Sequence, residues 1–363
     1  MKTMRKLSII ASIVLVFAFV LASCAPKAEA AAPAEEAAPA EEAAPAEEAA
    51  PAFKAAMITD LGGLSTSEET KGFSDLGWDA FKKAKEDLGI ETTLIESKEL
   101  ADLEPNLRKM ADEGYNIIVG VGYLFTDAIA AVAPDYPDTK FAIVDSVVDS
   151  PNVMSLTFAE EQGSFLVGAL AAGMSKSGTI GFVGGMESAL IEKFEAGYIA
   201  GARAINPDIK VVSGYTGSFS DVAAGKELTL TQYGQGADVV YAAAGACGLG
   251  TIEAAKEKGF WAIGVDTNQD AVAPGSVLTS MLKHVEVAVY DAIKEAYDGT
   301  FAGGVKVYDL KVDGVGYSDM KYSVDKVPAE LIEKVNTFAD EIKSGKIVVP
   351  TTRDEANAFV LPE

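Results

Sequence analysis

Carboxylates, aromatic rings and glycines follow the apolar segments of this 363-residue chain, at the points where strands of a parallel sheet would end. The first example, 54–81, reads as a short strand ending at Asp60, a Gly-Gly turn, a polar loop carrying Phe73 and an amphipathic helix. Ligands of open parallel α/β sheets bind beyond the carboxyl ends of the strands. Comparable segments follow later apolar stretches, at Gly122-Tyr123, Asp145-Ser146, Gly184-Gly185-Met186, 217–221, 245–250 and Asp266-Thr267-Asn268.

The residue types at these strand ends favour one kind of ligand. Asp60, Asp145 and Asp266 suit a molecule that is rich in hydroxyls or carries positive charge, because carboxylates accept hydrogen bonds. Phe73 and Phe219 suit a flat ring held between two aromatic side chains. Phosphate recognition would want lysine, arginine or a Walker loop, and none stands at these strand ends. The pattern therefore indicates a nucleoside better than a free sugar or an amino acid.

Each of these residues also has a structural interpretation. Asp60 and Asp145 would cap the following helices if they bind nothing. Phe73 and Phe219 would be ordinary core residues. The segment 245–250 is a weak match to a dinucleotide-binding loop, and we interpret it as a tight turn that lets backbone approach a ligand.

The sequence gives little support for catalysis. Paired acids in a cleft are compatible with a hydrolase of nucleosides or sugars, so that alternative remains. We find no nucleophile elbow, no metal-ligand spacing and no histidine among the strand-end loops, and we expect no enzyme activity, metal or cofactor. Cys247 is interpreted as a small packed residue, and His284 as a surface or interlobe histidine. The net charge of −24 argues against nucleic acid or anionic lipid as partners.

Strand and helix patterns alternate from Phe53 onward, which predicts an α/β fold with parallel sheets. The predicted strands are 55–59, 91–95, 117–121, 141–145, 153–158, 179–183, 210–215, 238–243, 261–266, 277–281 and 305–312. The predicted helices are 72–88, 103–113, 126–132, 161–174, 190–205, 223–233, 251–258, 285–297 and 329–344.

Two runs of strand–helix units predict two Rossmann-like lobes, since the chain is too long for one ordinary core. The elements after Asp266 are too few for a third domain. We assign 53–158 plus 277–312 to lobe I and 159–276 plus 313–363 to lobe II. The chain then crosses between lobes near Phe158, Ser276 and Val312, and such a hinge would close over a ligand.

The N-terminal part reads as a leader and a tether. Lys2, Arg5 and Lys6 precede an apolar run of signal-peptide length. Leu-Ala-Ser-Cys at 21–24 resembles the bacterial lipobox, which implies a signal peptide over 1–23 and lipidation of Cys24. Residues 24–52 then hold the lipidated cysteine and an Ala/Pro/Glu tether, which we expect to be extended because proline recurs every six residues.

Many blocks of the chain, in order from about Ala55 to Ile342, resemble the basic membrane protein family. The blocks are MITDLGG, KGFSDLGWDAF, KFAIVDSVVDSPNV, EEQGSFLVGALAA, IGFVGGME, FEAGYIAGARAINP, YTGSFSDVAAGKE, IGVDTNQ and SMLKHVEVAVYDAI. The family's best-known members are bacterial purine-nucleoside receptor lipoproteins that serve ABC importers. The resemblance implies a type I periplasmic-binding-protein fold.

The resemblance also implies roles for single residues. Phe73 and Phe219 would stack on the two faces of a purine, and Asp60 would lie near the base. Asp145, Asp266 and Lys283 would lie close to the ribose hydroxyls. Where the family commonly has Phe-Asn, this chain has Phe-Ser at 73–74. Asp75 or Asp79 is then expected to replace the missing amide.

These expectations describe a lipid-anchored solute-binding protein that closes two lobes on a nucleoside, with a purine as the expected base. The resemblance implies delivery to an ABC permease and its ATPase subunits, a monomeric state, and a cell-membrane location facing the periplasm or the exterior. Another ligand, such as a sugar, a furanone signal or riboflavin, remains an alternative. A sensor rather than a transporter is a further one.

Overall fold

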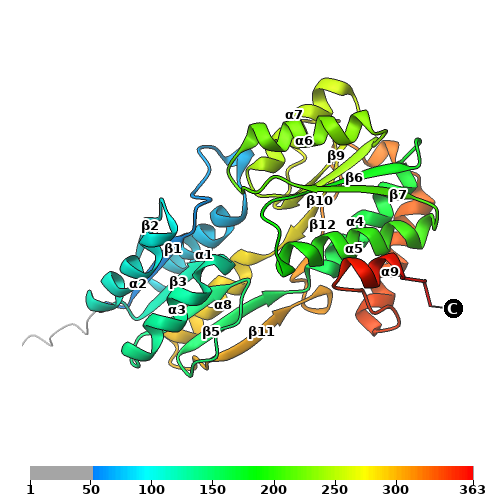
Figure 1. Cartoon of the computed structure of the whole chain (residues 1–363). Helices are drawn as coiled ribbons and strands as arrows, with labels where there is room; N and C mark the ends of the chain where they lie inside the picture. The colour runs from blue at the N-terminus through cyan, green and yellow to red at the C-terminus, as the bar shows by residue number, and fades with distance from the viewer. Residues whose placement is uncertain (1–51, 363) are drawn as a thin grey trace, which may run out of the picture. The chain divides into compact units, whose positions relative to one another are not determined.

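The computed structural model describes residues 52–362, in which strands and helices alternate in two parallel-dominated sheets (Figure 1). The strands are β1 (Lys54–Thr59), β2 (Glu91–Glu96), β3 (Ile117–Val121), β4 (Lys140–Val144), β5 (Val153–Phe158), β6 (Thr179–Gly184), β7 (Lys210–Tyr215), β8 (Val239–Ala243), β9 (Trp261–Asp266), β10 (Val277–Lys283), β11 (Gly304–Tyr308) and β12 (Val315–Tyr317). The helices are α1 (Phe73–Leu88), α2 (Leu103–Asp112), α3 (Thr126–Val132), α4 (Glu160–Met174), α5 (Ala189–Ile205), α6 (Val222–Gly234), α7 (Cys247–Lys258), α8 (Val285–Tyr297), α9 (Ala329–Ser344) and α10 (Arg353–Asn357).

The first sheet has the strand order β11-β5-β4-β3-β1-β2, and the second has β12-β10-β9-β8-β6-β7. All neighbouring strands run parallel except β12, which pairs antiparallel with β10. In each sheet the strand order reverses once, between β1 and β3 and between β6 and β8. Ligands of doubly wound sheets bind at such switch points, outside the carboxyl ends of the strands.

Helices cover both faces of each sheet, and the strand residues explain why. Successive side chains of a strand point to opposite faces. Ala55 and Met57 of β1 pack with α1 and α8, whereas Ala56 and Ile58 pack with α2 and α3. Each of these four residues is fully buried, as expected for a parallel sheet with two covered faces.

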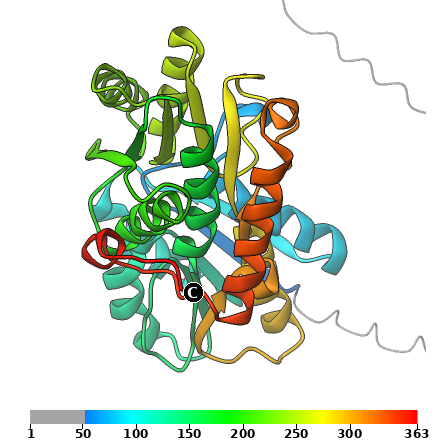
Figure 2. The same ribbon diagram turned by 90° about the vertical axis from the view of Figure 1, so that its right-hand side faces the viewer.

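Helices α4 and α5 pack unusually closely because glycines lie at their contact. A Cβ on Gly197 would overlap the backbone of Glu161, and one on Gly201 would overlap the backbone of Phe165. Helix α9 packs on α4 and α10 packs on α5, so the C-terminal segment closes this side of the second sheet (Figure 2).

The chain crosses between the sheets three times, but one crossing differs from the prediction. Strand β10 pairs with β9 and therefore belongs to the second sheet, so residues 277–283 do not lie in the first lobe. The crossing follows Lys283 instead of lying near Ser276, because β10 pairs with β9 and the chain stays in the second sheet until that strand ends. Strand β11 returns to the first sheet, beside β5.

Three local predictions also change. The segment 245–250 is not a loop, since α7 begins at Cys247 and Gly250 packs on the backbone of α6. The predicted strand 305–312 ends at Tyr308 and is followed by a 3-10 turn. The short elements β12 and α10 carry too few residues for a periodic signal.

Within the described residues, no helix combines the length and hydropathy needed to cross a bilayer. The signal peptide, Cys24 and nearly all of the tether lie in residues 1–51, outside the described part of the chain.

Candidate ligand-binding site

One cavity lies at the switch points of both sheets, and all seven residues predicted to bind a ligand line its wall. It encloses about 920 Å³ of space free of protein atoms, part of which is open solvent. The seven predicted residues are Asp60, Phe73, Asp75, Asp145, Phe219, Asp266 and Lys283. Residues spread from 60 to 283 therefore meet because the strands of each sheet point the same way.

Asp60 follows β1 at the first switch point. Its Oδ1 atom accepts a hydrogen bond from the backbone N–H of Gly62 at 3.0 Å, so the carboxylate holds a turn instead of capping a helix. Gly122, at the end of β3, has φ 121°, and a Cβ there would overlap Oδ2 of Asp60. Burial raises the pKa of Asp60 to about 6, although the Gly62 hydrogen bond opposes this shift.

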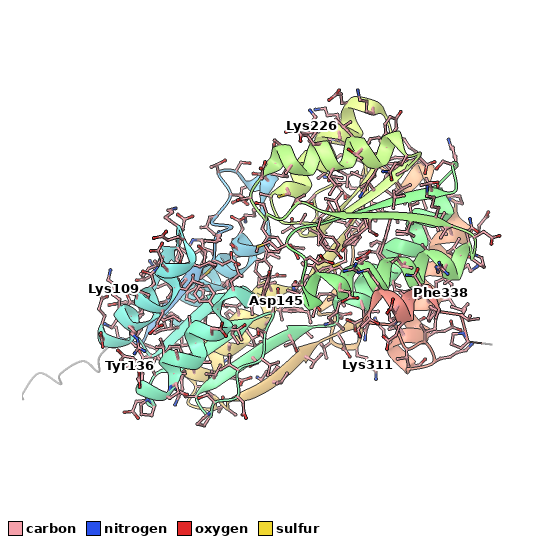
Figure 3. All side chains as sticks on the ribbon, in the orientation of Figure 1. Lys109, Tyr136, Asp145, Lys226, Lys311 and Phe338 are labelled. Atoms are coloured by element: carbon pink, nitrogen blue, oxygen red, sulfur yellow. The ribbon has the colours of Figure 1, made fainter. Side chains whose placement is uncertain are left out.

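Lys283 is the last of the seven predicted residues in the sequence, and it lies where the two sheets join. Its Nζ atom is 2.6 Å from Oδ1 of Asp145 and 3.1 Å from Oε1 of Glu160, and its side chain is 1 % exposed. Burial lowers the pKa of Lys283, but the carboxylates of Asp145, Glu160 and Asp266 outweigh burial and raise it. Figure 3 shows Asp145 at the junction between the sheets.

Three phenylalanine rings surround the same ammonium group. Its Nζ lies 5.2 Å from the ring centroid of Phe73, 4.9 Å from that of Phe158 and 5.5 Å from that of Phe194. Distances below about 6 Å allow cation–π attraction, which strengthens when the cation is desolvated. Phe158 also stacks on Tyr308, with ring centroids 5.4 Å apart. Lys283 therefore contacts Phe158 at the first crossing and is itself the last residue before the second crossing. Tyr308, at the third crossing, is linked to Lys283 because it stacks on Phe158.

Asp145 and Asp266 share an unusual backbone conformation. Their φ angles are 70° and 65°, in the left-handed region that non-glycine residues seldom occupy. Burial raises the pKa of Asp266 to about 6, with Glu160 adding to the shift and Lys283 opposing it. Burial likewise raises the pKa of Asp145, against the attraction of Lys283. Strained residues of this kind cluster at functional sites.

A second lysine, which is half-buried, extends this network and was missed by the sequence analysis. Lys193 of α5 lies 2.5 Å from Glu160 and 3.4 Å from Glu161, and it donates to the carbonyl of Phe158 at 2.7 Å. The two glutamates follow Ala159 just beyond the end of β5, so the strand-end pattern that identified Asp145 points to them as well. Lys193 lies within a helix, and nothing in its sequence neighbourhood identifies it.

Asp75 lines the cavity but uses its oxygens on the loop before α1. The carboxylate accepts hydrogen bonds from the N–H of Ser65 at 3.1 Å and of Gly72 at 2.9 Å. Asp79, the other predicted substitute for the amide, pairs with Lys71 and Lys82 and does not line the cavity. Both acids therefore hold local structure in this arrangement.

Two contacts join the rims of the cavity. The hydroxyl of Thr267, after β9, donates to the carbonyl of Lys71 at 2.8 Å. The ring of Tyr123, after β3, meets the ring of Phe219 edge-on, with centroids 6.3 Å apart. The two halves thus touch on the side of the cavity away from the crossings.

The remaining residues of interest lie outside the cavity wall. Cys247 is fully buried, as predicted for a small packed residue. His284 is half-buried before α8, with Nδ1 2.8 Å from Glu286. Among the described residues, no group of three or more histidines, cysteines or acids is arranged to hold a metal ion.

Two doubly wound sheets, three crossings and a cavity at both switch points define a two-lobed ligand-binding protein. The chain belongs to the family described as ABC transporter substrate-binding protein PnrA-like, whose model matches residues 57–353. Membership confirms the predicted family and fold class, and also the prediction that the protein is not an enzyme.

Relatives of known name agree with this assignment. The chain is 36 % identical over 320 residues to the ABC transporter nucleoside-binding protein BmpA of Lactococcus lactis subsp. cremoris, covering 82 % of this chain and 89 % of that protein. It is also 36 % identical to basic membrane protein A1 of Borrelia garinii subsp. bavariensis, covering 80 % and 88 %. A solute-binding protein of Aeropyrum pernix K1 superposes with a TM-score of 0.76 at 28 % identity, covering 84 % and 96 %.

Proposed function

We propose that this protein captures a nucleoside, with a purine as the expected base, and delivers it to an ABC permease and its ATPase subunits. The observation that carries this proposal is that Phe73 and Phe219, from opposite sheets, line the same cavity as three strand-end acids. Base stacking on an aromatic side chain contributes about 1–3 kcal/mol per base. The name of the Lactococcus lactis relative, a nucleoside-binding protein, supports the same ligand class.

The distribution of charge supports a nucleoside over a nucleotide. Asp60, Asp145, Asp266 and Glu160 lie in or beside the cavity, and Lys283 is already paired with two of them. A phosphate would meet excess negative charge and no free guanidinium or ammonium group on the wall. Ribose hydroxyls, in contrast, donate to carboxylates, and such charge-assisted hydrogen bonds contribute about 1.5–3 kcal/mol.

The proposed role in transport requires attachment to the cell membrane, and the lipobox at 21–24 supports such attachment. Lipidation of Cys24 would anchor the chain by acyl groups, each buried methylene contributing about 0.8 kcal/mol. The tether would then hold the binding unit on the periplasmic or outer side of the cell membrane. Closure of the two halves on a ligand gives the permease a shape that differs from the open state.

Calorimetry on the purified full-length protein tests the ligand. We expect inosine, guanosine or adenosine to bind, cytidine and riboflavin to bind more weakly, and Phe219→Ala and Asp266→Ala to abolish this preference for a purine. Tight binding of free ribose with no gain from the base would overturn the nucleoside assignment in favour of a sugar. Riboflavin as the best ligand, or a furanone signal where no nucleoside binds, would overturn it likewise.

A further inference from the structure

Gly185 lies directly behind the ring of Phe219. It follows β6 at the switch point of the second sheet and is buried, but it does not belong to the cavity wall. A Cβ placed on Gly185 would overlap Cε1 and Cδ1 of Phe219 and lie 3.1 Å from Cζ. Phe219 does line the cavity, so its ring separates Gly185 from the ligand space.

The backbone conformation at Gly185 does not require glycine. Gly217 and Gly245, which flank the same cluster, have φ angles of 71° and 56°, in the left-handed region. Gly185 is absent from the residues with positive φ. Its φ is therefore not in the region that favours glycine, and the constraint that the structure shows at this position is the space taken by the ring.

The backbone of Phe219 cannot move away from a new Cβ. Its carbonyl accepts a hydrogen bond from the N–H of Ala246 at 2.9 Å, and the neighbouring N–H of Gly217 donates to the carbonyl of Gly185 at 3.1 Å. The carbonyl of Ser218 accepts from the hydroxyl of Thr216 at 2.7 Å and from Sγ of Cys247 at 3.3 Å. A clash at Gly185 must therefore be relieved by rotating the ring.

The ring lies between Gly185 and the cavity, so a rotation away from Gly185 moves it toward the cavity. Gly185 lies on one side of it, and the edge contact with Tyr123, 6.3 Å between centroids, borders another. A displaced ring would narrow the space beside Phe73, which lies on the other half of the wall.

We infer that Gly185 is a specificity-determining positioning residue. Its missing side chain sets the position of the Phe219 ring, and thereby the width of the slot between Phe219 and Phe73 that would hold a flat base. This inference rests on the proposed function, because the proposed nucleoside supplies the planar base that the slot would hold. Gly185 acts through Phe219 and touches no ligand itself.

A double-mutant cycle on the full-length protein tests the inference by calorimetry with inosine, guanosine and adenosine. We expect Gly185→Ala to weaken the best-bound nucleoside at least tenfold. In the Phe219→Ala background, the same substitution should change affinity less than twofold. Gly234→Ala, where a Cβ meets nothing within 4 Å, is the matched control and should leave affinity unchanged. Equal losses from Gly185→Ala in both backgrounds would contradict the inference.

A second cycle needs no ligand. We expect Gly185→Ala to lower the thermal unfolding midpoint of the wild type but not that of Phe219→Ala, because the clash disappears with the ring. If the wild type binds no nucleoside, the proposed function fails, while this cycle still decides whether Gly185 and Phe219 are coupled. Equal decreases in both backgrounds would show that Gly185 does not act through the ring.

Discussion

Nζ of Lys283 lies 2.6 Å from Oδ1 of Asp145, although the two residues belong to different sheets. Asp145 follows β4 of the first sheet, and Lys283 ends β10 of the second. Glu160, the first residue of α4 after the first crossing, contacts the same ammonium group at 3.1 Å. The ion pair therefore joins the two halves near the crossings, in the wall of the cavity. Its removal has consequences for stability that the exposed ion pairs of this chain lack.

Replacing Lys283 by methionine leaves Asp145 and Glu160 as buried carboxylates without their shared cation. Breaking one partner of a buried pair costs about 3–5 kcal/mol. We expect Lys283→Met to lower the free energy of unfolding by that amount in a urea titration. Lys294→Met, which removes an exposed pair with Asp298 at the C-terminal end of α8, is the control and should change stability little. Similar effects of the two substitutions would show that the buried network does not stabilise the fold.

Asp60 makes stability depend on pH in a predictable direction. Its folded-state pKa is about 6 and its ordinary value 3.8, so between these values the folded chain binds the proton and the unfolded chain releases it. Stability must then rise as pH falls from above 6 toward 4, by at most about 3 kcal/mol from this group.

Unfolding of Asp60→Asn at pH 7.5 and pH 5.0 isolates this contribution. The variant should be more stable than the wild type at pH 7.5, or equal to it, and its gain in stability on acidification should be smaller. Asp266, whose pKa is also raised to about 6, still titrates in the variant, so part of the wild-type gain persists. An identical pH response of the two proteins would rule out a raised pKa at Asp60.

Phe73→Leu keeps apolar volume at the start of α1 but removes a π-face from the cavity wall. If the ring stacks on a base, affinity for the nucleoside should fall about 5- to 150-fold, which corresponds to the loss of about 1–3 kcal/mol. Tyr233→Ala is the control, since that ring stacks on Phe260 away from the cavity. Unchanged affinity in Phe73→Leu would exclude stacking on this side of the ligand.

Thr267→Val removes the hydroxyl that donates to the carbonyl of Lys71 across the rim. The net contribution of such a hydrogen bond is about 0.5–1.5 kcal/mol. We expect bound nucleoside to dissociate about 2- to 12-fold faster in stopped-flow measurements, because the closed state loses a contact. Thr337→Val, which loses only a hydrogen bond within α9, should dissociate at the wild-type rate.

The strand-end pattern predicted most of the cavity wall, because parallel strands bring their ends to one edge. It identified Asp60, Asp145 and Asp266 without a structure, since each directly follows an apolar run. It did not identify Lys193, whose position depends on how closely α4 and α5 pack. The family resemblance assigned a ligand role to Asp75, whose oxygens are occupied by loop amides that no local pattern reveals.

The lobe assignment shows a similar limit. Strand β10 has the same apolar pattern whichever sheet it joins, and only pairing with β9 decides its place. Likewise, nothing in the sequence around Gly185 distinguishes a glycine needed for space from one needed for a turn. That distinction requires the φ angle and the position of the Phe219 ring.

The placement of β11 and α8 affects how the chain folds during its synthesis. The first sheet takes its edge strand from residues 304–308, and α8 packs on α1 from residues 285–297. A ribosome must therefore deliver the whole second sheet, apart from β12, before the N-terminal half has all of its parts. Until β11 is made, the edge of β5 has no partner strand, and a fragment ending before residue 304 would be prone to aggregate through that edge.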